Sequence, residues 1–178
     1  MLRNTSESFG LVSRILHWLV FVLLVMVTIG GLQLDDLPQG PEKLDTVLTH
    51  KSVGVLILAL MLLRLVWRLA NPKPQPLTDD PKNARISGLV QMLLFLLLIV
   101  QPVLGVLMSQ AGGHPVSPFG LFELPALVGE NKELGKTLHG IHGRLWLVIF
   151  GILLIHIAGS LKQHFIHKNR TLVRMIKG

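Results

Sequence analysis

Histidine is the residue of this sequence best suited to bind a metal or to transfer a proton, and the chain contains eight of them. Four lie inside or beside strongly apolar stretches, where an ionisable side chain is costly and is therefore a candidate for a function. These four are His17, His50, His142 and His156. A lone histidine at a helix end is more often an interfacial polar residue, so only the arrangement of all four together indicates a site.

The spacing of the four histidines places them at two depths. His142 and His156 are fourteen residues apart, which in an α-helix is about 21 Å and nearly four whole turns. They therefore point from one face of one helix at two levels. His17 and His50 each stand at the beginning of an apolar stretch, and in antiparallel helices these two positions lie at opposite levels. Topology pairs His17 with His156 at an inner level and His50 with His142 at an outer level.

Two separated sites with two histidines each are typical of haem, because a porphyrin supplies four equatorial nitrogens and leaves two axial positions. Zinc would require further ligands, which the apolar stretches do not offer. The chain has no cysteine, so thiolate sites and covalently attached haem are excluded. The sequence predicts two non-covalent b-type haems. Several glycines offer room for a flat macrocycle, although they also suit ordinary helix packing: Gly30, Gly31, Gly54, Gly105, Gly151 and Gly159.

His139 is an alternative outer ligand, because the run His139-Gly-Ile-His142 places both histidines on one helix face. Only His142 stands near a whole number of turns from His156, which favours it. Three cations stand close to the proposed ligands: Arg14, Lys51 and Arg144. They could neutralise haem propionates, or they could equally anchor the helices to lipid headgroups.

The elements that must position these histidines are four apolar blocks, each near the roughly 20 residues that cross a membrane. Half of the chain is hydrophobic and only 15% is charged. The alternating pattern of a membrane barrel is absent, so helices are predicted. They are expected at about 15–34, 50–70, 86–108 and 138–165. The fold class is an all-α membrane protein, a four-transmembrane-helix bundle in one domain over 1–178. The first helix lacks a small-residue cleavage site and is interpreted as retained.

Lysine and arginine are divided unevenly between the two sides of the predicted bundle. Twelve fall before the first helix, around the proline-rich loop 71–85 or after the fourth helix, and five fall on the other side. Both termini and this loop are therefore predicted to be cytoplasmic, with the loop 109–137 outside and folded back over the bundle. The formal net charge of +7 then faces anionic lipid and gives no reason to expect nucleic-acid binding.

Together with the four histidines, several motifs make the whole chain resemble the bacterial cytochrome b561 family. They are Arg14-Ile-Leu-His-Trp18, Thr49-His-Lys-Ser-Val-Gly54, Arg64-Leu-Val-Trp-Arg68, Pro118-Phe-Gly-Leu121 and the ending His164-Phe-Ile-His-Lys-Asn-Arg-Thr-Leu-Val-Arg-Met175. The resemblance implies a four-helix protein of the bacterial cytoplasmic membrane that carries electrons between a periplasmic donor and quinone. Its family ligands, two for each of two haems b, fall on His17, His50, His142 and His156.

One member type of this family is a superoxide oxidase, which oxidises periplasmic superoxide and reduces ubiquinone, and the resemblance makes this the expected activity. The quinone region of that type lies near the inner haem and uses a histidine seven residues after the helix-four ligand. That position here is Gln163, with His164 as its neighbour. An outer surface that attracts superoxide should be positive. The candidates are Lys51, Lys132, Lys136, His139 and Arg144.

Two other functions compete with this expectation. The same haems would suit a membrane cytochrome b subunit that accepts electrons from a periplasmic redox partner, as in hydrogenase-type cytochromes b. A stable copurifying subunit would favour that role. A haem-free structural or transport bundle is the third alternative, since intramembrane histidines often line translocation routes. The colour of the purified protein decides between haem and no haem.

Overall fold

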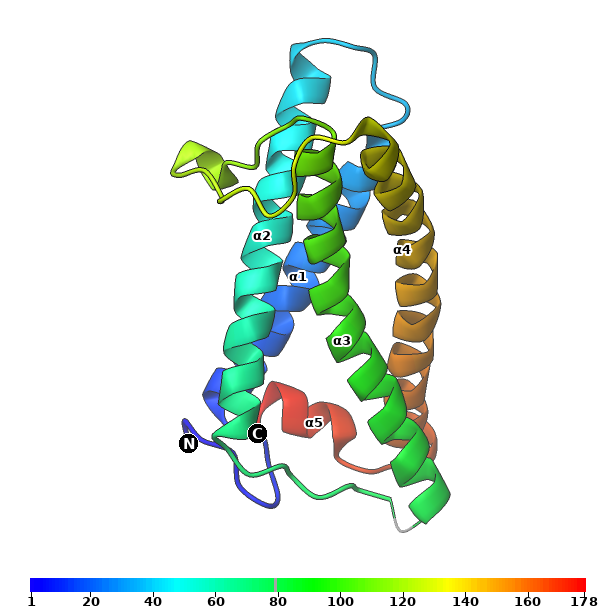
Figure 1. Cartoon of the computed structure of the whole chain (residues 1–178). Helices are drawn as coiled ribbons and strands as arrows, with labels where there is room; N and C mark the ends of the chain where they lie inside the picture. The colour runs from blue at the N-terminus through cyan, green and yellow to red at the C-terminus, as the bar shows by residue number, and fades with distance from the viewer. Residues whose placement is uncertain (79) are drawn as a thin grey trace.

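The computed structural model describes residues 1–78 and 80–178, and it is all-helical over those residues. Four long helices form the bundle (Figure 1): α1 (Leu11–Gln33), α2 (Pro41–Leu69), α3 (Pro81–Ala111) and α4 (Lys132–Leu161). Three short elements complete it: the 3₁₀ turn η1 (Pro118–Gly120), the π-helical turn η2 (Lys162–Ile166) and α5 (Thr171–Ile176).

The helices extend beyond the apolar blocks that predicted them, because hydropathy marks only the part of a helix that faces lipid. α2 begins at Pro41, well before the expected residue 50, and α3 begins at Pro81. Proline suits the first helical turn because its missing N–H would have no partner there. At α3 the side chain of Asp80 also accepts a hydrogen bond from the backbone of Lys82 (2.9 Å). α3 also continues to Ala111 and α4 begins at Lys132, so the loop between them spans 112–131 and is shorter than the expected 109–137.

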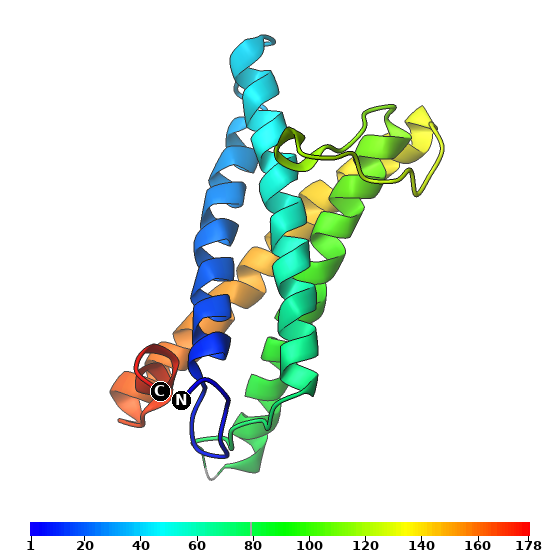
Figure 2. The ribbon, with the colours of Figure 1, turned by 90° about the vertical axis from the view of Figure 1, so that its left-hand side faces the viewer.

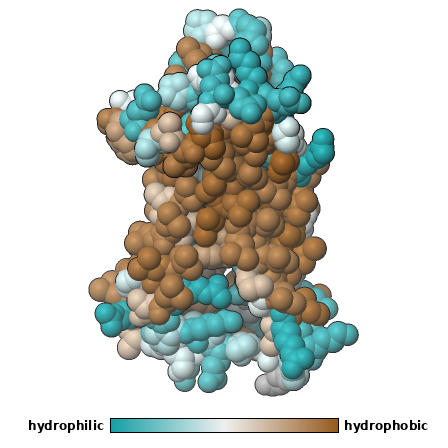
Figure 3. Space-filling model, in the orientation of Figure 1, coloured by the Kyte–Doolittle hydropathy of each residue, from teal (hydrophilic) through white to brown (hydrophobic). Residues whose placement is uncertain are grey.

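All four long helices are long and apolar enough to cross a membrane. Figure 3 shows the corresponding surface, an apolar belt around the middle of the molecule between two hydrophilic ends. Outward-facing leucine, isoleucine, valine and phenylalanine side chains make this belt, and lipid is the solvent that suits them.

The helices pack in chain order, α1 on α2, α2 on α3 and α3 on α4. Val20, Ile57, Met61, Leu98 and Ile149 form the buried centre. In the described part of the chain, α1 and α4 do not pack closely against each other, and Figure 2 shows α4 running obliquely behind α1 and α2.

Both termini lie at the same end of the bundle, called here the termini end (Figures 1 and 2). α5 lies across that end. Two contacts fasten it: the indole of Trp18 donates to the carbonyl of Met175 (2.9 Å), and the guanidinium of Arg174 donates to the carbonyl of Gln75 (2.9 Å). The C-terminal segment is thus tied to α1 and to the loop that follows α2.

The opposite end, called here the loop end, carries the α3–α4 loop, which folds back onto α2 as expected. The backbone N–H of Phe119 donates to the hydroxyl of Ser52 (2.8 Å). The amide of Gln110 holds the loop on both sides, since it donates to the carbonyl of Pro125 and accepts from the N–H of Leu127, each at 2.9 Å. These hydrogen bonds hold the loop against the loop end of the bundle.

Candidate haem sites

The four predicted histidines meet in two pairs, one toward each end of the bundle. His17 of α1 and His156 of α4 have ring centres 6.3 Å apart and form the inner pair, toward the termini end. His50 of α2 and His142 of α4 have ring centres 6.3 Å apart and form the outer pair, toward the loop end. These are the partners that helix topology predicted. His139 is exposed and lines a surface pocket instead.

The spacing within both pairs suits one iron atom between two imidazoles. A metal–nitrogen bond to histidine is about 2 Å long and the ring centre lies about 1 Å behind the nitrogen, so opposed imidazoles on one iron have ring centres roughly 6 Å apart. Over residues 1–78 and 80–178, no group of three or more His, Cys, Asp or Glu side chains could hold a metal ion. A porphyrin, which brings its own four nitrogens, fits two-histidine sites better than zinc does.

His50 is held by the neighbouring helix α1 through one hydrogen bond and one close approach. Its Nδ1 lies 3.0 Å from the carbonyl oxygen of Val27. One turn further along α1 is Gly31, where a Cβ would stand only 2.8 Å from Cε1 of the imidazole. The ring therefore sits against bare backbone, and a side chain at residue 31 would push it away.

His142 is held by α3 in the same way. Its Nδ1 lies 3.1 Å from the carbonyl oxygen of Gln101, and a Cβ at Gly105, again one turn further, would stand 3.3 Å from its Cε1. The side-chain amide of Gln101 also donates to the carbonyl of His142 (3.0 Å), so the two residues bind each other reciprocally. Both outer histidines thus use a carbonyl and a glycine four residues apart on an adjacent helix.

These carbonyl contacts decide which ring nitrogen carries the proton. A carbonyl oxygen only accepts, so Nδ1 of His50 and of His142 must be the N–H donor, which leaves Nε2 with the free lone pair. Such a contact also orients the ring and raises its basicity as a ligand. Sequence reasoning missed both partners. Gln101 left a signal as a polar residue in an apolar run, whereas a backbone carbonyl such as that of Val27 leaves none.

Comparison with known proteins assigns the sequence to one family. Residues 8–178 match the family described as prokaryotic cytochrome b561. The chain belongs to that family. It is therefore a membrane haem protein with an oxidoreductase or electron-transfer role, and the cytochrome b561 family implies haem b.

Three relatives cover nearly the whole chain of this cytochrome b561 family member. Cytochrome b561 homolog 2 of Escherichia coli is 30% identical, over 97% of this chain and 93% of the relative. The probable superoxide oxidase CybB of Yersinia pestis is 29% identical, over 90% and 91%. Cytochrome b561 homolog 1 of Escherichia coli is 25% identical, over 90% and 92%. Each alignment covers at least 90% of this chain and at least 91% of the relative.

The inner pair of this cytochrome b561 family member has different surroundings. Nδ1 of His17 lies 3.4 Å from Nη2 of Arg64, a residue of α2. From the sequence, Arg64 was grouped with the cations around the proline-rich loop, but the structure places it half-buried beside the histidines. Besides the carbonyl partners of the outer histidines, Arg64 is therefore another residue beside the histidines that was not predicted from the sequence. Its signal was a charge only five residues inside the end of an apolar helix.

Four of the glycines that were predicted to leave room for a macrocycle have open space where a side chain would be. At Gly54, Gly151 and Gly159 an added Cβ would meet no atom within 4 Å, and the same holds at Gly30. A pocket of about 230 Å³ adjoins His50 between α1 and α2, and polar residues line it together with apolar ones: Met26, Val27, Gly30, Asp45, Thr46, Thr49 and Val53. The ring spacing of the two pairs therefore remains the main structural support for haem.

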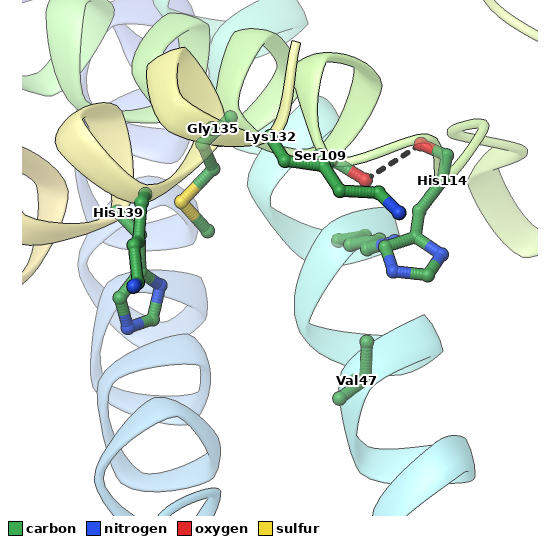
Figure 4. A pocket seen from close by; sticks show the side chains of 10 residues that line it. Val47, Ser109, His114, Lys132, Gly135 and His139 are labelled. Carbon is green, nitrogen blue, oxygen red and sulfur yellow. Dashed lines mark hydrogen bonds between the residues drawn. The ribbon is translucent and has the colours of Figure 1, made fainter. Parts of the chain in front are cut away.

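A second, basic pocket of about 430 Å³ opens at the loop end, between α2, the end of α3 and the start of α4. Figure 4 shows the side chains of His114, Lys132 and His139 around it. Lys51 and Lys136 also line it, so four of the five cationic candidates for attracting an anion share this pocket. Arg144 is the exception, since it is exposed and does not line it.

The remaining predicted residues lie at the termini end. Nη1 of Arg14 donates to the carbonyl of Ile176 (2.7 Å), so this cation is engaged by the C-terminus. Oε1 of Gln163 accepts from the amide of Asn169 (2.7 Å), which leaves the NH₂ group of Gln163 available. His164 points Nδ1 at the carbonyl of Asn169 (3.0 Å). Gln163 and His164 thus both contact Asn169.

Proposed function

We propose that this protein transfers electrons across the bacterial cytoplasmic membrane through two haems b, oxidising superoxide on the outer side and reducing ubiquinone on the inner side. The observation that carries the proposal is the occurrence of two histidine pairs with the same 6.3 Å separation of ring centres, built at two levels on one helix. When bound, the haems supply the one-electron carriers that amino-acid side chains lack.

Each pair of histidines would hold one haem through its axial positions, His50 with His142 on the outer side and His17 with His156 on the inner side. Val27 and Gln101 fix the outer rings through their carbonyls. The bundle keeps water from both sites with its apolar belt. In this arrangement the chain would supply the axial ligands of the haems, set their depth in the membrane and orient the ligating rings.

The basic pocket supports superoxide as the outer donor. Lysines and histidines there attract an anion and raise its local concentration, and Lys51 brings one of these charges directly next to His50 in the chain. A relative of similar length carries the name probable superoxide oxidase. Each superoxide that gives up one electron leaves as O₂, so two are needed for each quinone.

On the inner side, ubiquinone takes those two electrons and two protons. The free NH₂ group of Gln163 can donate a hydrogen bond to a quinone carbonyl. His164 and His167 stand beside it and can deliver protons from the adjacent water. This assignment places the termini end in the cytoplasm, as the excess of lysine and arginine there favours.

Two measurements on the purified protein test the function. A pyridine haemochrome assay should give two haems b per chain, and one haem per chain would contradict the two-level arrangement. Stopped-flow mixing of the oxidised protein with superoxide should then reduce the haems rapidly, with ubiquinone consumed at half the rate of superoxide. Slow reduction together with a stable copurifying periplasmic subunit would instead support the partner-dependent cytochrome b.

A further inference from the structure

Arg64 is a cation inside the membrane-spanning bundle, and its hydrogen-bond partners among the described residues include no acid. It is half-buried on α2. Its contacts within the described residues are the thioether of Met61, 3.8 Å from Nη1, and Nδ1 of His17, 3.4 Å from Nη2. The ring of His17 lies 6.3 Å from that of His156, so Arg64 stands beside the inner pair.

Among the described residues, the membrane-spanning parts of the four long helices offer Arg64 no carboxylate. α1 and α3 contain neither aspartate nor glutamate. The acids of the other two long helices, Glu42, Asp45 and Glu133, belong to their loop-end turns. A charge that is partly withdrawn from water without a partner is costly, and such residues in membrane helices usually pair with something. A partner that does not belong to these helices would suit this charge.

In the described part of the chain, Nδ1 of His17 has no hydrogen-bond acceptor at the same place. An imidazole that binds iron through Nε2 carries its proton on Nδ1 and needs an acceptor for it. His50 and His142 each have a backbone carbonyl for this purpose. Nδ1 of His17 faces a guanidinium, which only donates. A carboxylate oxygen to one side of both nitrogens could accept from both, and guanidinium groups bind carboxylates especially well.

We propose that Arg64 binds a propionate carboxylate of the inner haem, and that its charge holds this haem at a higher reduction potential than the outer one. The proposal rests on the two haems of the proposed function. A nearby cation favours the reduced iron, which carries one positive charge fewer. At the outer pair, the carbonyl contacts make the imidazoles more basic and favour oxidised iron. The difference would direct electrons from the outer to the inner side.

The test is a spectroscopic measurement of both haem potentials in the purified full-length protein, in Arg64→Gln, Arg64→Lys and the matched control Arg68→Gln. Arg68 is one turn further along α2, exposed, and lies over the ring of Phe95 at 5.7 Å. In Arg64→Gln the reduced-to-oxidised ratio of one haem at a fixed potential should fall about tenfold, equivalent to about 59 mV for one electron. In Arg64→Lys the same ratio should fall less, and in Arg68→Gln it should equal that of the wild-type protein.

Repeating Arg64→Gln in a His50→Ala background, which keeps only the inner haem, assigns the shifted potential. Loss of one haem from Arg64→Gln, with its retention in Arg64→Lys, also supports the proposal because propionate binding is part of it. Unmoved potentials, equal shifts of both haems, or a shift of the outer haem alone would overturn it. If the wild-type protein holds fewer than two haems, the proposed function fails first, whatever Arg64 does.

Discussion

At the scale of single residues, the outer histidines are positioned by backbone and not by side chains. Each ring contacts a carbonyl and, four residues later, a glycine of a neighbouring helix: Val27 and Gly31 for His50, Gln101 and Gly105 for His142. The carbonyl sets the tautomer, and the glycine lets the ring approach close enough to reach it. The inner histidines have no such carbonyl contact among the described residues, and Arg64 takes that place at His17.

The pairing predicts which haem each histidine supports. His50→Ala or His142→Ala should remove the outer haem, and His17→Ala or His156→Ala the inner one, because each haem loses one of its two axial ligands. Haem content and optical spectra of the purified variants measure this. His139→Ala is the internal control and should keep both haems. Loss of the outer haem from His139→Ala, with its retention in His142→Ala, would show that the outer ligand is wrongly assigned.

Gly31 should tolerate no side chain. A Cβ there would stand 2.8 Å from the ring of His50, against 3.3 Å for a Cβ at Gly105 and the ring of His142. Gly31→Ala should therefore weaken outer-haem binding more than Gly105→Ala, by on the order of 1–3 kcal/mol of overpacking. Haem retention during dilution in detergent gives the comparison. Gly88→Ala, where an added Cβ meets nothing within 4 Å, is the control; equal haem loss in all three would refute this role of Gly31.

Gln163 should matter for quinone and not for haem. Gln163→Glu keeps the oxygen that accepts from Asn169 but removes the amide donor. Reoxidation of the haems by ubiquinone should slow by up to about tenfold, the value of one hydrogen bond, with both haem spectra intact. If a histidine also delivers protons, His164→Ala or His167→Ala should slow the reaction further as pH rises. Unchanged rates in all three variants would place the quinone elsewhere.

At the scale of elements, the C-terminal helix α5 is a clamp on the termini end. Arg174 is only 7% exposed, donates to the carbonyl of Gln75 and lies over the ring of Phe9 at 5.8 Å. Partial burial lowers the pKa of Arg174, as does neighbouring Arg170, while Glu7 acts in the opposite direction. This single side chain therefore joins three segments that are far apart in the sequence. α5 also accepts a hydrogen bond from Trp18, the residue that follows His17 in α1, through the carbonyl of Met175.

Arg174→Ala should release this clamp. It removes a hydrogen bond from a charged group to the carbonyl of Gln75, worth at most about 1.5–3 kcal/mol. Hydrogen exchange in detergent should rise in residues 171–178 and in the segment before α1, while the middle of the bundle stays protected. Arg170→Ala, at an exposed position of the same segment, is the matched control. Identical exchange in Arg174→Ala and wild type would mean that other contacts hold α5.

At the scale of the whole molecule, charge and hydropathy set the position of the chain in the membrane. The apolar belt of Figure 3 sets its depth. The excess of lysine and arginine at the termini end favours the cytoplasm for that end, where anionic lipid stabilises them. The order of the two histidine pairs across the membrane follows from this orientation.

Engineered cysteines can report the orientation directly, because the natural chain has none. Ser117→Cys lies exposed at the loop end and Ser6→Cys lies exposed at the termini end. In intact bacterial cells whose outer membrane has been made permeable, a membrane-impermeant maleimide should label the first and not the second. Ser6→Cys should react only after the inner membrane is opened. The reverse pattern would invert the proposed direction of electron transfer.

The sequence by itself determined the features that depend on local periodicity and composition. Four apolar blocks predicted four helices, and the fourteen residues between His142 and His156 predicted two levels on one helix face. Antiparallel topology then chose the partners, and the structure pairs those same rings. The bounds of α2 and α3 could not be predicted as well from the sequence, because polar helical turns beyond the lipid carry no hydropathy signal.

Only the tertiary structure decided what lies beside each histidine. The carbonyl of Val27, the approach of Gly31 and the place of Arg64 all depend on how one helix is rotated and shifted against another. A backbone carbonyl is the same in every residue, so no residue type marks the one that orients a ring. A cation near a helix end can point to lipid headgroups or into the bundle, and only packing separates the two.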